Sequence, residues 1–445
     1  MGAVAALDSV LLGGLYTTDA LRLVLGERGL LDRYLAVEAA TAHSQADLGV
    51  IPAEAASAIS TIRVDDLDTE QLGLRASEVG YPIIGLVEQL TTLVHDGMGQ
   101  WAHWGLTTQD VTDTAQVLQV RDSLALIETD LLGLVQALQS HVIAHRTTAM
   151  IGRSQGQQAL PVTFGYRAAG WLDQILRHLD RLDELRPRVE VVQIGGAIGT
   201  LASLAPHGLA ARAKVAERLG LGEPDISWHS LRDRFVEVVA WCAQVSASLG
   251  KTGLDITLSA QTEVAELREG ASGISSTMPH KRNAILSQQL MRAARLTRTY
   301  LDLALDAAVA DHDRATAVWS LEWTALAPAL AVAGGATHAA EVLLRALEID
   351  MDAMATNLAK TDGLIMAEAV MMKLAPKNGR QNAHDLVDDM VEQSRSTDAT
   401  FAEVVAERAP DAVDALDPAA YLGHTSDQID AVLERCAARL SIKSD

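Results

Sequence analysis

One apolar seam in the middle of the chain constrains the fold more than any other feature of the sequence. Seven aliphatic residues recur there at alternating steps of three and four positions: Val117, Val120, Leu124, Ile127, Leu131, Leu134 and Leu138. This spacing places them on one stripe of an α-helix of many turns. Because such a helix has to bury its stripe against partner helices, the seam predicts a long-helix bundle.

The distribution of prolines favours long helices elsewhere in the chain. No proline occurs between Pro224 and Pro279 or between Pro279 and Pro328, and proline is the residue that most often ends a helix. Aromatic residues make up only 4% of the 445 residues, which also favours helices over sheets. We expect an all-α fold with a helical N-terminal domain over residues 1–105, a long-helix bundle over 106–350 and a helical C-terminal domain over 351–445.

Charge and cysteine content exclude several classes of protein. The formal net charge of −22 argues against nucleic acid as a partner, because proteins bind a phosphate backbone with lysine and arginine. Cys242 and Cys436 lie far apart, which predicts no structural metal or disulfide framework and agrees with a reducing cytoplasm. The N-terminus lacks the pattern of a signal peptide. The most apolar stretch, residues 325–340, contains Pro328, a Gly-Gly pair and His338, as an interior or interface helix does, and we expect no membrane span.

The run Gly-Ile-Ser-Ser-Thr-Met-Pro-His-Lys-Arg-Asn at residues 273–283 concentrates polar chemistry directly before an apolar-periodic segment. A serine-rich run in this position is usually only a helix cap. A helix N-terminus, however, also offers N–H groups and a positive dipole end to a carboxylate or phosphate. Lys281 and Asn283 add a cation and an amide donor, so the run indicates an anion site that could contain a base.

Two further segments carry donors suited to a carboxylate. Residues 103–110 read His-Trp-Gly-Leu-Thr-Thr-Gln-Asp, in which Gly105 allows close approach of the backbone to a ligand and the hydroxyl and amide groups can donate. Taken alone, this segment could equally be a capped helix start, since Asp110 and Thr112 are good capping residues. Residues 152–165 read Gly-Arg-Ser-Gln-Gly-Gln-Gln-Ala-Leu-Pro-Val-Thr-Phe-Gly and bring an arginine together with several amides.

Together the three segments resemble the signature motifs of the fumarase/aspartase superfamily. Residues 275–283 match its S-S-x-M-P-x-K-x-N core, residues 103–110 resemble H-x-G-x-T-S-x-D, and residues 152–165 resemble G-R-T-H-x-Q-x-A-x-P-x-T-x-G. The resemblance implies an L-aspartase-like fold and a homotetramer. In such a tetramer the long helices of four subunits form a twenty-helix core, and each active site takes its three segments from three chains. The resemblance implies neither a metal nor an organic cofactor.

The resemblance also implies roles for individual residues. Ser275 would be the base, acting as an alkoxide whose pKa is lowered by nearby positive charge when a loop over about residues 267–284 closes on hinges at Gly270 and Gly273. Lys281, counted with Ser275 and His103 as catalytic, would stabilise the dianionic aci-carboxylate that forms when a proton leaves the carbon next to a carboxylate. The expected substrate-binding residues are Thr107, Thr108, Gln109, Arg153, Gln155, Gln157, Arg232, Ser276, Met278, Asn283 and Arg314.

One departure from the motifs affects the chemistry directly. Gln155 stands where many members of the superfamily have the histidine assigned as general acid, and a glutamine side chain can donate a hydrogen bond but cannot supply a proton near neutrality. This departure weakens the parallel with adenylosuccinate and argininosuccinate lyases. It leaves open whether His103 or His229 takes over proton transfer.

Other segments resemble the 3-carboxy-cis,cis-muconate cycloisomerase branch of the superfamily. Residues 227–234 are similar to its W-H-x-x-R-D-R, and residues 312–323 to its H-E-R followed by W-H-x-E-W. Trp323 stands where adenylosuccinate lyases have a phosphate-binding arginine, which argues against a nucleotide substrate. Ser320, Ile274 and Ala284 depart from the residues usual in the branch.

We therefore expect an enzyme that forms or breaks a bond β to a carboxylate in a small polycarboxylate. It is expected to be most similar to the cycloisomerases, whose lactonisation reverses a β-elimination. A fumarate-releasing carbon–nitrogen lyase that acts on a nitrosuccinate or adenylosuccinate is one alternative. A catalytically silent structural relative is another.

Overall fold

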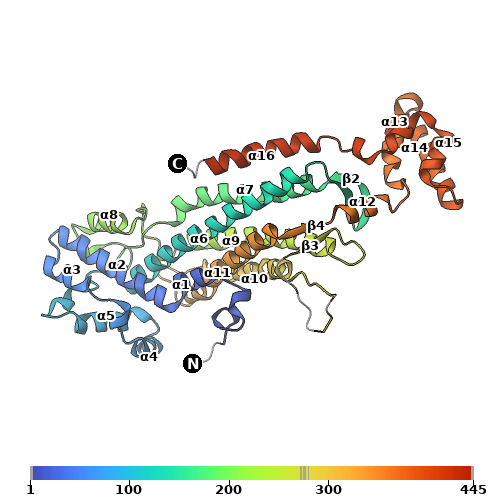
Figure 1. Cartoon of the computed structure of the whole chain (residues 1–445). Helices are drawn as coiled ribbons and strands as arrows, with labels where there is room; N and C mark the ends of the chain where they lie inside the picture. Colours follow the sequence, from blue (N-terminus) through green and yellow to red (C-terminus); the bar gives the residue numbers. More distant parts are fainter. Residues whose placement is uncertain (1–3, 271–272, 274–276, 279, 442–445) are drawn as a thin grey trace. The chain divides into compact units, whose positions relative to one another are not determined.

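The computed structural model describes residues 4–270, 273, 277–278 and 280–441 (Figure 1). The chain divides into two compact units. Unit 1 comprises the chain up to Leu131 together with residues 178–250 and 289–339, and unit 2 comprises residues 132–177, 251–288 and the chain from Ala340 onward. The predicted domain boundaries fall just before the first long helix, which starts at Thr108, and at Asp350, the N-cap of a short helix over Met351–Ala359. The three-domain division stays a prediction.

Long helices dominate the middle of the chain, as the seam predicts (Figure 1). They are α6 (Thr108–Ala144), α7 (Phe164–Val189), α9 (Asp233–Ser259), α10 (Ile285–Ala307) and α11 (Leu321–Arg345). The seven seam residues all lie in α6, and each is at most 1% exposed. The expectation of an all-α fold is confirmed.

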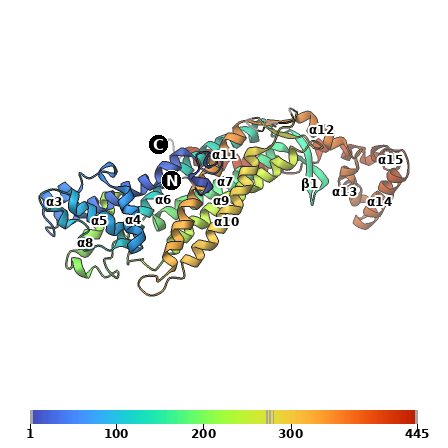
Figure 2. The same ribbon diagram turned by 90° about the horizontal axis from the view of Figure 1, so that it is seen from below.

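Unit 1 also contains shorter helices, most of which build a core of their own against the start of α6. These helices are α1 (Asp19–Leu25), α2 (Glu27–Asp47), α3 (Ala53–Ile59), α4 (Thr69–Val79), α5 (Pro82–Leu93) and α8 (Gly208–Leu219). Tyr34, Ile83 and Leu86 pack there with Val111 and Leu118 of α6. Figure 2 shows α3, α4 and α5 grouped around this core. Because Thr18 and Asp68 each accept a backbone N–H in the first turn, α1 and α4 start at defined residues.

The Gly-Gly pair noted in the sequence lies in α11 and lets the N-terminal segment pack directly on that helix. A Cβ atom at Gly335 would overlap the carbonyl oxygen of Tyr16 and lie 2.7 Å from the Cα atom of Thr17. A Cβ atom at Gly334 would overlap the side chain of Leu21. By length and composition the stretch Val318–Arg345 could cross a membrane, but 72% of its apolar window is buried inside the protein. This burial is typical of a core helix.

Unit 2 contains two small antiparallel strand pairs and the C-terminal helices. Strands β1 (Ala149–Ser154) and β2 (Gln157–Thr163) form a hairpin, and β3 (Leu267–Glu269) pairs with β4 (Leu347–Ile349). The helices are α12 (Met351–Ala359), α13 (Ala367–Asn378), α14 (Arg380–Ser396), α15 (Phe401–Arg408) and α16 (Thr425–Ser441). Figure 2 shows β1 near α12, and α13 to α15 grouped together. These last helices share a core that includes Val370, Met390 and Phe401. The strands were not expected from the sequence.

Short 3₁₀ helices connect these elements. They are η1 (Ala6–Asp8), η2 (Gly13–Leu15), η3 (Val64–Asp66), η4 (Met98–Trp101), η5 (Ala202–Leu204), η6 (Val318–Ser320), η7 (Leu364–Met366), η8 (Pro410–Leu416) and η9 (Pro418–Ala420). Both η1 and η2 belong to the N-terminal segment that leads into α1.

Candidate active site

His103 lies on the turn before α6 and is held by Glu38 of α2. Its backbone N–H donates to Glu38 Oε2 at 3.0 Å, and its Nδ1 lies 2.6 Å from Glu38 Oε1. Glu38 is only 1% exposed, so this carboxylate has little water around it. Burial alone would lower the pKa of His103, but the attraction and hydrogen bond of Glu38 outweigh burial and raise that pKa above its ordinary value. The pairing therefore favours a protonated imidazole and leaves Nε2 for a ligand.

Thr107 and Arg314 meet although they are far apart in the sequence. Arg314 Nη1 donates to Thr107 Oγ1 at 2.7 Å, and Nη2 donates to the carbonyl oxygen of Ala197 at 2.7 Å. Thr107 precedes α6, and Thr108 is its first residue. The structure thus brings together two residues predicted to bind a carboxylate, at a helix N-terminus whose dipole favours an anion.

Asp110 accepts four hydrogen bonds that connect the start of α6 with the segments around residues 195 and 229. Its Oδ1 accepts hydrogen bonds from the N–H of Gly195 at 2.9 Å and from His229 Nε2 at 2.8 Å, and its Oδ2 accepts from the N–H groups of Thr107 and Gly196 at 3.0 and 2.9 Å. The side chain of His229 is only 3% exposed, whereas that of His103 is 17% exposed. Of the two histidines considered for proton transfer, His103 is the more accessible one.

Arg232 and Gln109, both predicted to bind substrate, are placed in the interior of unit 1. Arg232 is 2% exposed and donates two hydrogen bonds each to Asp113 and Glu322, at 2.6 to 3.0 Å. Burial lowers the pKa of Arg232, but the two carboxylates outweigh burial and raise it. Gln109 is 1% exposed and donates to Asp113 and to the carbonyl oxygen of His229. The contacts of Arg232 therefore join α6 to the starts of α9 and α11.

The predicted segment over residues 152–165 forms most of the hairpin of unit 2. Ser154 pairs with Gln157, so Gln155 and Gly156 make a two-residue turn with φ angles of 51° and 79°. Positive φ at both central positions is the signature of a type I′ hairpin turn. The side chains of Gln155 and Gln157 are exposed. The residue that replaces the usual histidine of the superfamily thus lies at the tip of an exposed turn.

Arg153, in β1, is paired with a buried carboxylate. Its two terminal nitrogens donate to the two oxygens of Glu266 at 2.7 Å each, and Glu266 is 0% exposed. Asn357 of α12 donates to the same carboxylate at 2.9 Å. This bidentate pair fixes β1 against the segment that leads into β3, and so holds the base of the hairpin in place.

Lys281 and Asn283 line a cavity of about 550 Å³ in unit 2. Four of its lining residues can carry positive charge, namely Arg268, His280, Lys281 and Arg282. Two carboxylates also line the cavity, and both are engaged as helix caps. Glu269 accepts hydrogen bonds from the N–H and Oγ of Ser287 at the start of α10, and Asp350 accepts from the N–H of Ala353 at the start of α12. Of the four basic residues, Arg268 pairs with Glu348 at 3.3 Å. The cavity is therefore suited to an anionic ligand.

The neck of the predicted catalytic loop is closed by backbone contact. The N–H of Asn283 donates to the carbonyl oxygen of Gly273 at 3.0 Å. Gly273 has a φ of 97°, and a Cβ atom there would overlap the carbonyl oxygen of Asn283, so only glycine is compatible with this position. Met278 is 43% exposed. Ser275 and Ser276 lie outside the described residues.

The predicted site residues thus fall into groups. His103, Thr107, Thr108 and Arg314 belong to unit 1, whereas the hairpin and the cationic cavity belong to unit 2. Glu38 and Glu266, the partners of His103 and Arg153, were missed in the sequence. A signal for Glu38 did exist, because a lone acid in the apolar run Leu-Ala-Val-Glu-Ala-Ala has to find a buried partner.

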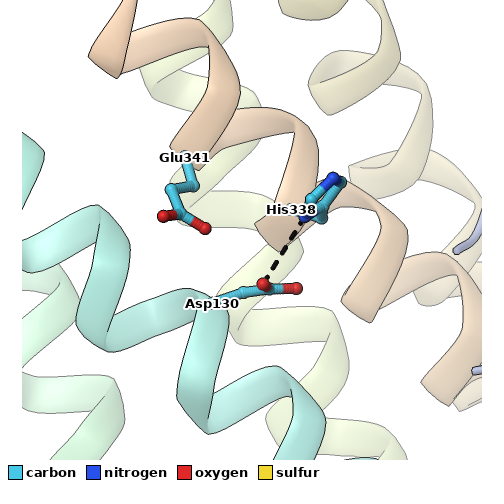
Figure 3. A group of neighbouring side chains, drawn as sticks. All are labelled: Asp130, His338 and Glu341. Carbon is cyan, nitrogen blue, oxygen red and sulfur yellow. Dashed lines mark hydrogen bonds and ion pairs between the residues drawn. The ribbon is translucent and has the colours of Figure 1, made fainter. Parts of the chain in front are cut away.

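Acidic and histidine side chains also gather at a place remote from the three segments in the sequence (Figure 3). His338 of α11 forms an ion pair with Asp130 of α6 at 3.5 Å. Glu341 follows His338 on α11 and pairs with Arg345 at 2.8 Å. His338 is 51% exposed, and we interpret these contacts as surface ion pairs.

The comparisons with known proteins define the class. The chain matches the Lyase family over residues 15–295 and the family described as adenylosuccinate lyase C-terminus over residues 363–432. Its structure is similar to the crystal structure of 3-carboxy-cis,cis-muconate lactonizing enzyme from Pseudomonas putida, with a TM-score of 0.91 and 35% identity, covering 95% of this chain and 98% of that one. The chain therefore belongs to the lyase family and is an enzyme of the fumarase/aspartase superfamily.

Three relatives show the range of activities at comparable distance. The chain is 40% identical to 3-carboxy-cis,cis-muconate cycloisomerase of Pseudomonas aeruginosa, over 93% of each chain. It is 38% identical to trans-aconitate decarboxylase 1 of Mycosarcoma maydis, over 95% of this chain and 88% of the relative. It is 35% identical to N-acetyl-S-(2-succino)cysteine lyase of Dickeya dadantii, over 96% of each. The expectation that the chain is an enzyme is confirmed. The alternative of a catalytically silent structural relative is not supported by these relatives, which are named as enzymes.

Proposed function

We propose that the enzyme catalyses β-elimination, or the reverse addition, on a small polycarboxylate, in the manner of a 3-carboxy-cis,cis-muconate cycloisomerase. The observation that carries the proposal is the cavity of unit 2 in which Lys281 and Asn283 lie beside the neck of the Ser275 loop. The 40% identity to a cycloisomerase supports the choice of reaction.

The chemistry requires a base and fixed positive charge. In the elimination direction Ser275, as an alkoxide, takes the proton from the carbon next to a carboxylate, and the electron pair passes into that carboxylate to give the aci-carboxylate dianion. Lys281 and Asn283 stabilise the dianion with a cation and an amide donor in one cavity. The dianion then expels the group on the β carbon. In the lactonising direction a carboxylate oxygen adds at that carbon, and the serine hydroxyl returns the proton.

Gln155 is consistent with a leaving group that needs no protonation. A departing carboxylate is already stable as an anion near neutrality, because carboxyl groups have a pKa near 4. A departing amine has to be protonated by a general acid. A glutamine at the tip of the hairpin therefore favours lactone chemistry over carbon–nitrogen cleavage. The same residue is the main argument against the carbon–nitrogen lyase alternative.

The residues of unit 1 are proposed to hold a substrate carboxylate. Arg314, Thr107 and the protonated His103 present donors near the start of α6, and Glu38 maintains the charge of the imidazole. Asp110 and Arg232 fix this arrangement from the interior. In this role His103 acts by hydrogen bonding and charge.

The second candidate is a lyase that releases fumarate from a substituted succinate. The 35% identity to N-acetyl-S-(2-succino)cysteine lyase supports it. In that case His103 would be the proton donor to the leaving group, and the remaining roles would be unchanged.

A homotetramer with shared active sites is part of the proposal. The carboxylate-binding group of unit 1 and the two segments of unit 2 would come together from three chains, as the superfamily resemblance implies. A cytoplasmic location and the absence of nucleic-acid and membrane partners belong to the same proposal.

Two substrates distinguish the candidates. Purified enzyme is given 3-carboxy-cis,cis-muconate in one cuvette and N-acetyl-S-(2-succino)cysteine in another, and ultraviolet absorbance follows loss of the diene or appearance of fumarate. Loss of the diene alone supports the cycloisomerase proposal, whereas fumarate production alone replaces it with the lyase.

A further inference from the structure

A second cavity, of about 390 Å³, lies in unit 1 between the N-terminal segment, α1 and α11. Leu21, Leu25 and Pro328 contribute apolar wall, and Arg22, Thr17 and Trp323 contribute hydrogen-bond donors. None of these residues belongs to the three motif segments. The exposed Asp8 also borders the cavity.

Four side-chain donor atoms around this cavity have no hydrogen-bond partner among the residues that the structure describes. This holds for Nε and Nη2 of Arg22, Oγ1 of Thr17 and Nε1 of Trp323, all of them buried atoms. Thr17 is 6% exposed. The side chain of Arg22 is 32% exposed, and its ion pair is a 3.9 Å contact from Nη1 to Asp19, whose side chain is 99% exposed. Because buried polar atoms nearly always have partners, four unpaired donors around one cavity indicate an acceptor that binds there.

Glycine at position 13 allows the side chain of Arg22 to lie against the backbone of η2. A Cβ atom at Gly13 would overlap Nη2 of Arg22 and lie 2.6 Å from Cζ, so the guanidinium rests on the backbone of η2 where any other residue would displace it. Gly334 and Gly335 bring the same segment against α11. Such an arrangement differs from that of a mobile surface arginine.

We propose that this cavity is a carboxylate-binding subsite. The guanidinium fork of Arg22 matches the two oxygens of a carboxylate, the Thr17 hydroxyl and the Trp323 indole N–H add donors, and the apolar wall receives a short hydrocarbon chain. Trp323 follows Glu322, which is bonded to Arg232 and through it to Asp113 of α6. The carboxylate belongs either to the substrate or to a separate small dicarboxylate. Only the first case rests on the proposed function.

Succinate binding to the full-length protein tests the subsite. Titration calorimetry compares wild type with Arg22→Met and Gly13→Ala, and Gly14→Ala is the matched control because a Cβ atom there meets nothing within 4 Å. Wild type and Gly14→Ala are expected to bind equally, and the other two variants at least tenfold more weakly. Without ligand, Arg22→Met is expected to unfold within a few degrees of wild type, because the ion pair that it removes is the long 3.9 Å contact with the exposed Asp19.

Several results would overturn the subsite. They are a wild-type Kd for succinate weaker than about 10 mM, or a Kd in Arg22→Met that equals the wild-type Kd. Muconate kinetics then identify the source of the carboxylate. A tenfold higher KM in Arg22→Met assigns the subsite to substrate, and an unchanged KM with weakened succinate binding assigns it to a separate dicarboxylate. Succinate binding through Arg22 in a protein that leaves muconate intact would sustain the subsite and refute the proposed function.

Discussion

Single residues in unit 1 separate into those proposed to bind substrate and those that stabilise the scaffold. Arg314 and Arg232 illustrate the difference. The guanidinium of Arg314 spans two oxygens, one from Thr107 and one from the backbone of Ala197, whereas Arg232 neutralises two buried carboxylates. Removing a partner from a buried charge network leaves the remaining charges without compensation.

We predict that two matched substitutions affect different properties, one the stability of the protein and the other its KM. Arg232→Met should destabilise the protein by about 3–5 kcal/mol, because Asp113 and Glu322 would be left buried and unpaired. Arg314→Met should leave the unfolding temperature within a few degrees of wild type and raise KM for a polycarboxylate. Thermal unfolding and steady-state kinetics on both variants check this. A stable Arg232→Met enzyme with raised KM would reverse the assignment.

The pairing of Glu38 with His103 predicts a pH-dependent stability. Because Glu38 raises the pKa of His103, the stabilisation from the charged imidazole is present below the unfolded value of about 6.5 and is lost as the pH rises through the folded value. Glu38→Gln should therefore lower the unfolding temperature more at pH 5.5 than at pH 9. The His103→Gln variant serves as the control, since Glu38→Gln on that background should show no such difference. An equal loss at both pH values would contradict the ion pair.

At the scale of elements, the long helices could be predicted because their signal is local and repeated. Seven seam residues in one stripe define α6 without reference to any other segment. The hairpin could not be predicted in this way, because it depends on a two-residue turn with a glutamine in a left-handed conformation. The pairs of Glu38 with His103 and of Arg153 with Glu266 join residues 65 and 113 positions apart. A local pattern can mark Glu38 as an acid that needs a partner, but it cannot identify that partner.

The turn geometry gives a prediction for the hairpin. Gln155→Asn would create an Asn-Gly pair, which is preferred in type I′ turns, and should stabilise unit 2 by a few tenths to about 1 kcal/mol. The reaction rate should stay unchanged if Gln155 transfers no proton. Gln157→Asn, outside the two central turn positions, is the control and should bring no gain in stability. A large loss of activity in Gln155→Asn alone would show that the reach of the Gln155 side chain matters for the reaction.

At the scale of the whole molecule, the proposed tetramer can be tested by complementation. Arg314→Met removes a proposed carboxylate-binding residue of unit 1, and Ser275→Ala removes the proposed base of unit 2. If active sites combine segments from different chains, mixed oligomers of the two variants should contain some intact sites. At a substrate concentration below the raised KM of Arg314→Met, they should therefore be more active than either variant alone. Coexpression with two affinity tags and an assay of the doubly purified protein checks this. An inactive mixed oligomer, or a fully active monomer by light scattering, would contradict the shared site.

The central claim is that the Ser275 loop, with Lys281 and Asn283 in the cavity beside its neck, performs proton transfer on a polycarboxylate. The most direct measurement is the diene absorbance of 3-carboxy-cis,cis-muconate with wild type, Ser275→Ala and, as the control, Thr277→Val side by side. The account predicts loss of absorbance with wild type and Thr277→Val, and a rate at least about a thousandfold lower with Ser275→Ala. Equal rates in wild type and Ser275→Ala would contradict the serine's role, and an unchanged spectrum in all three would contradict the muconate assignment.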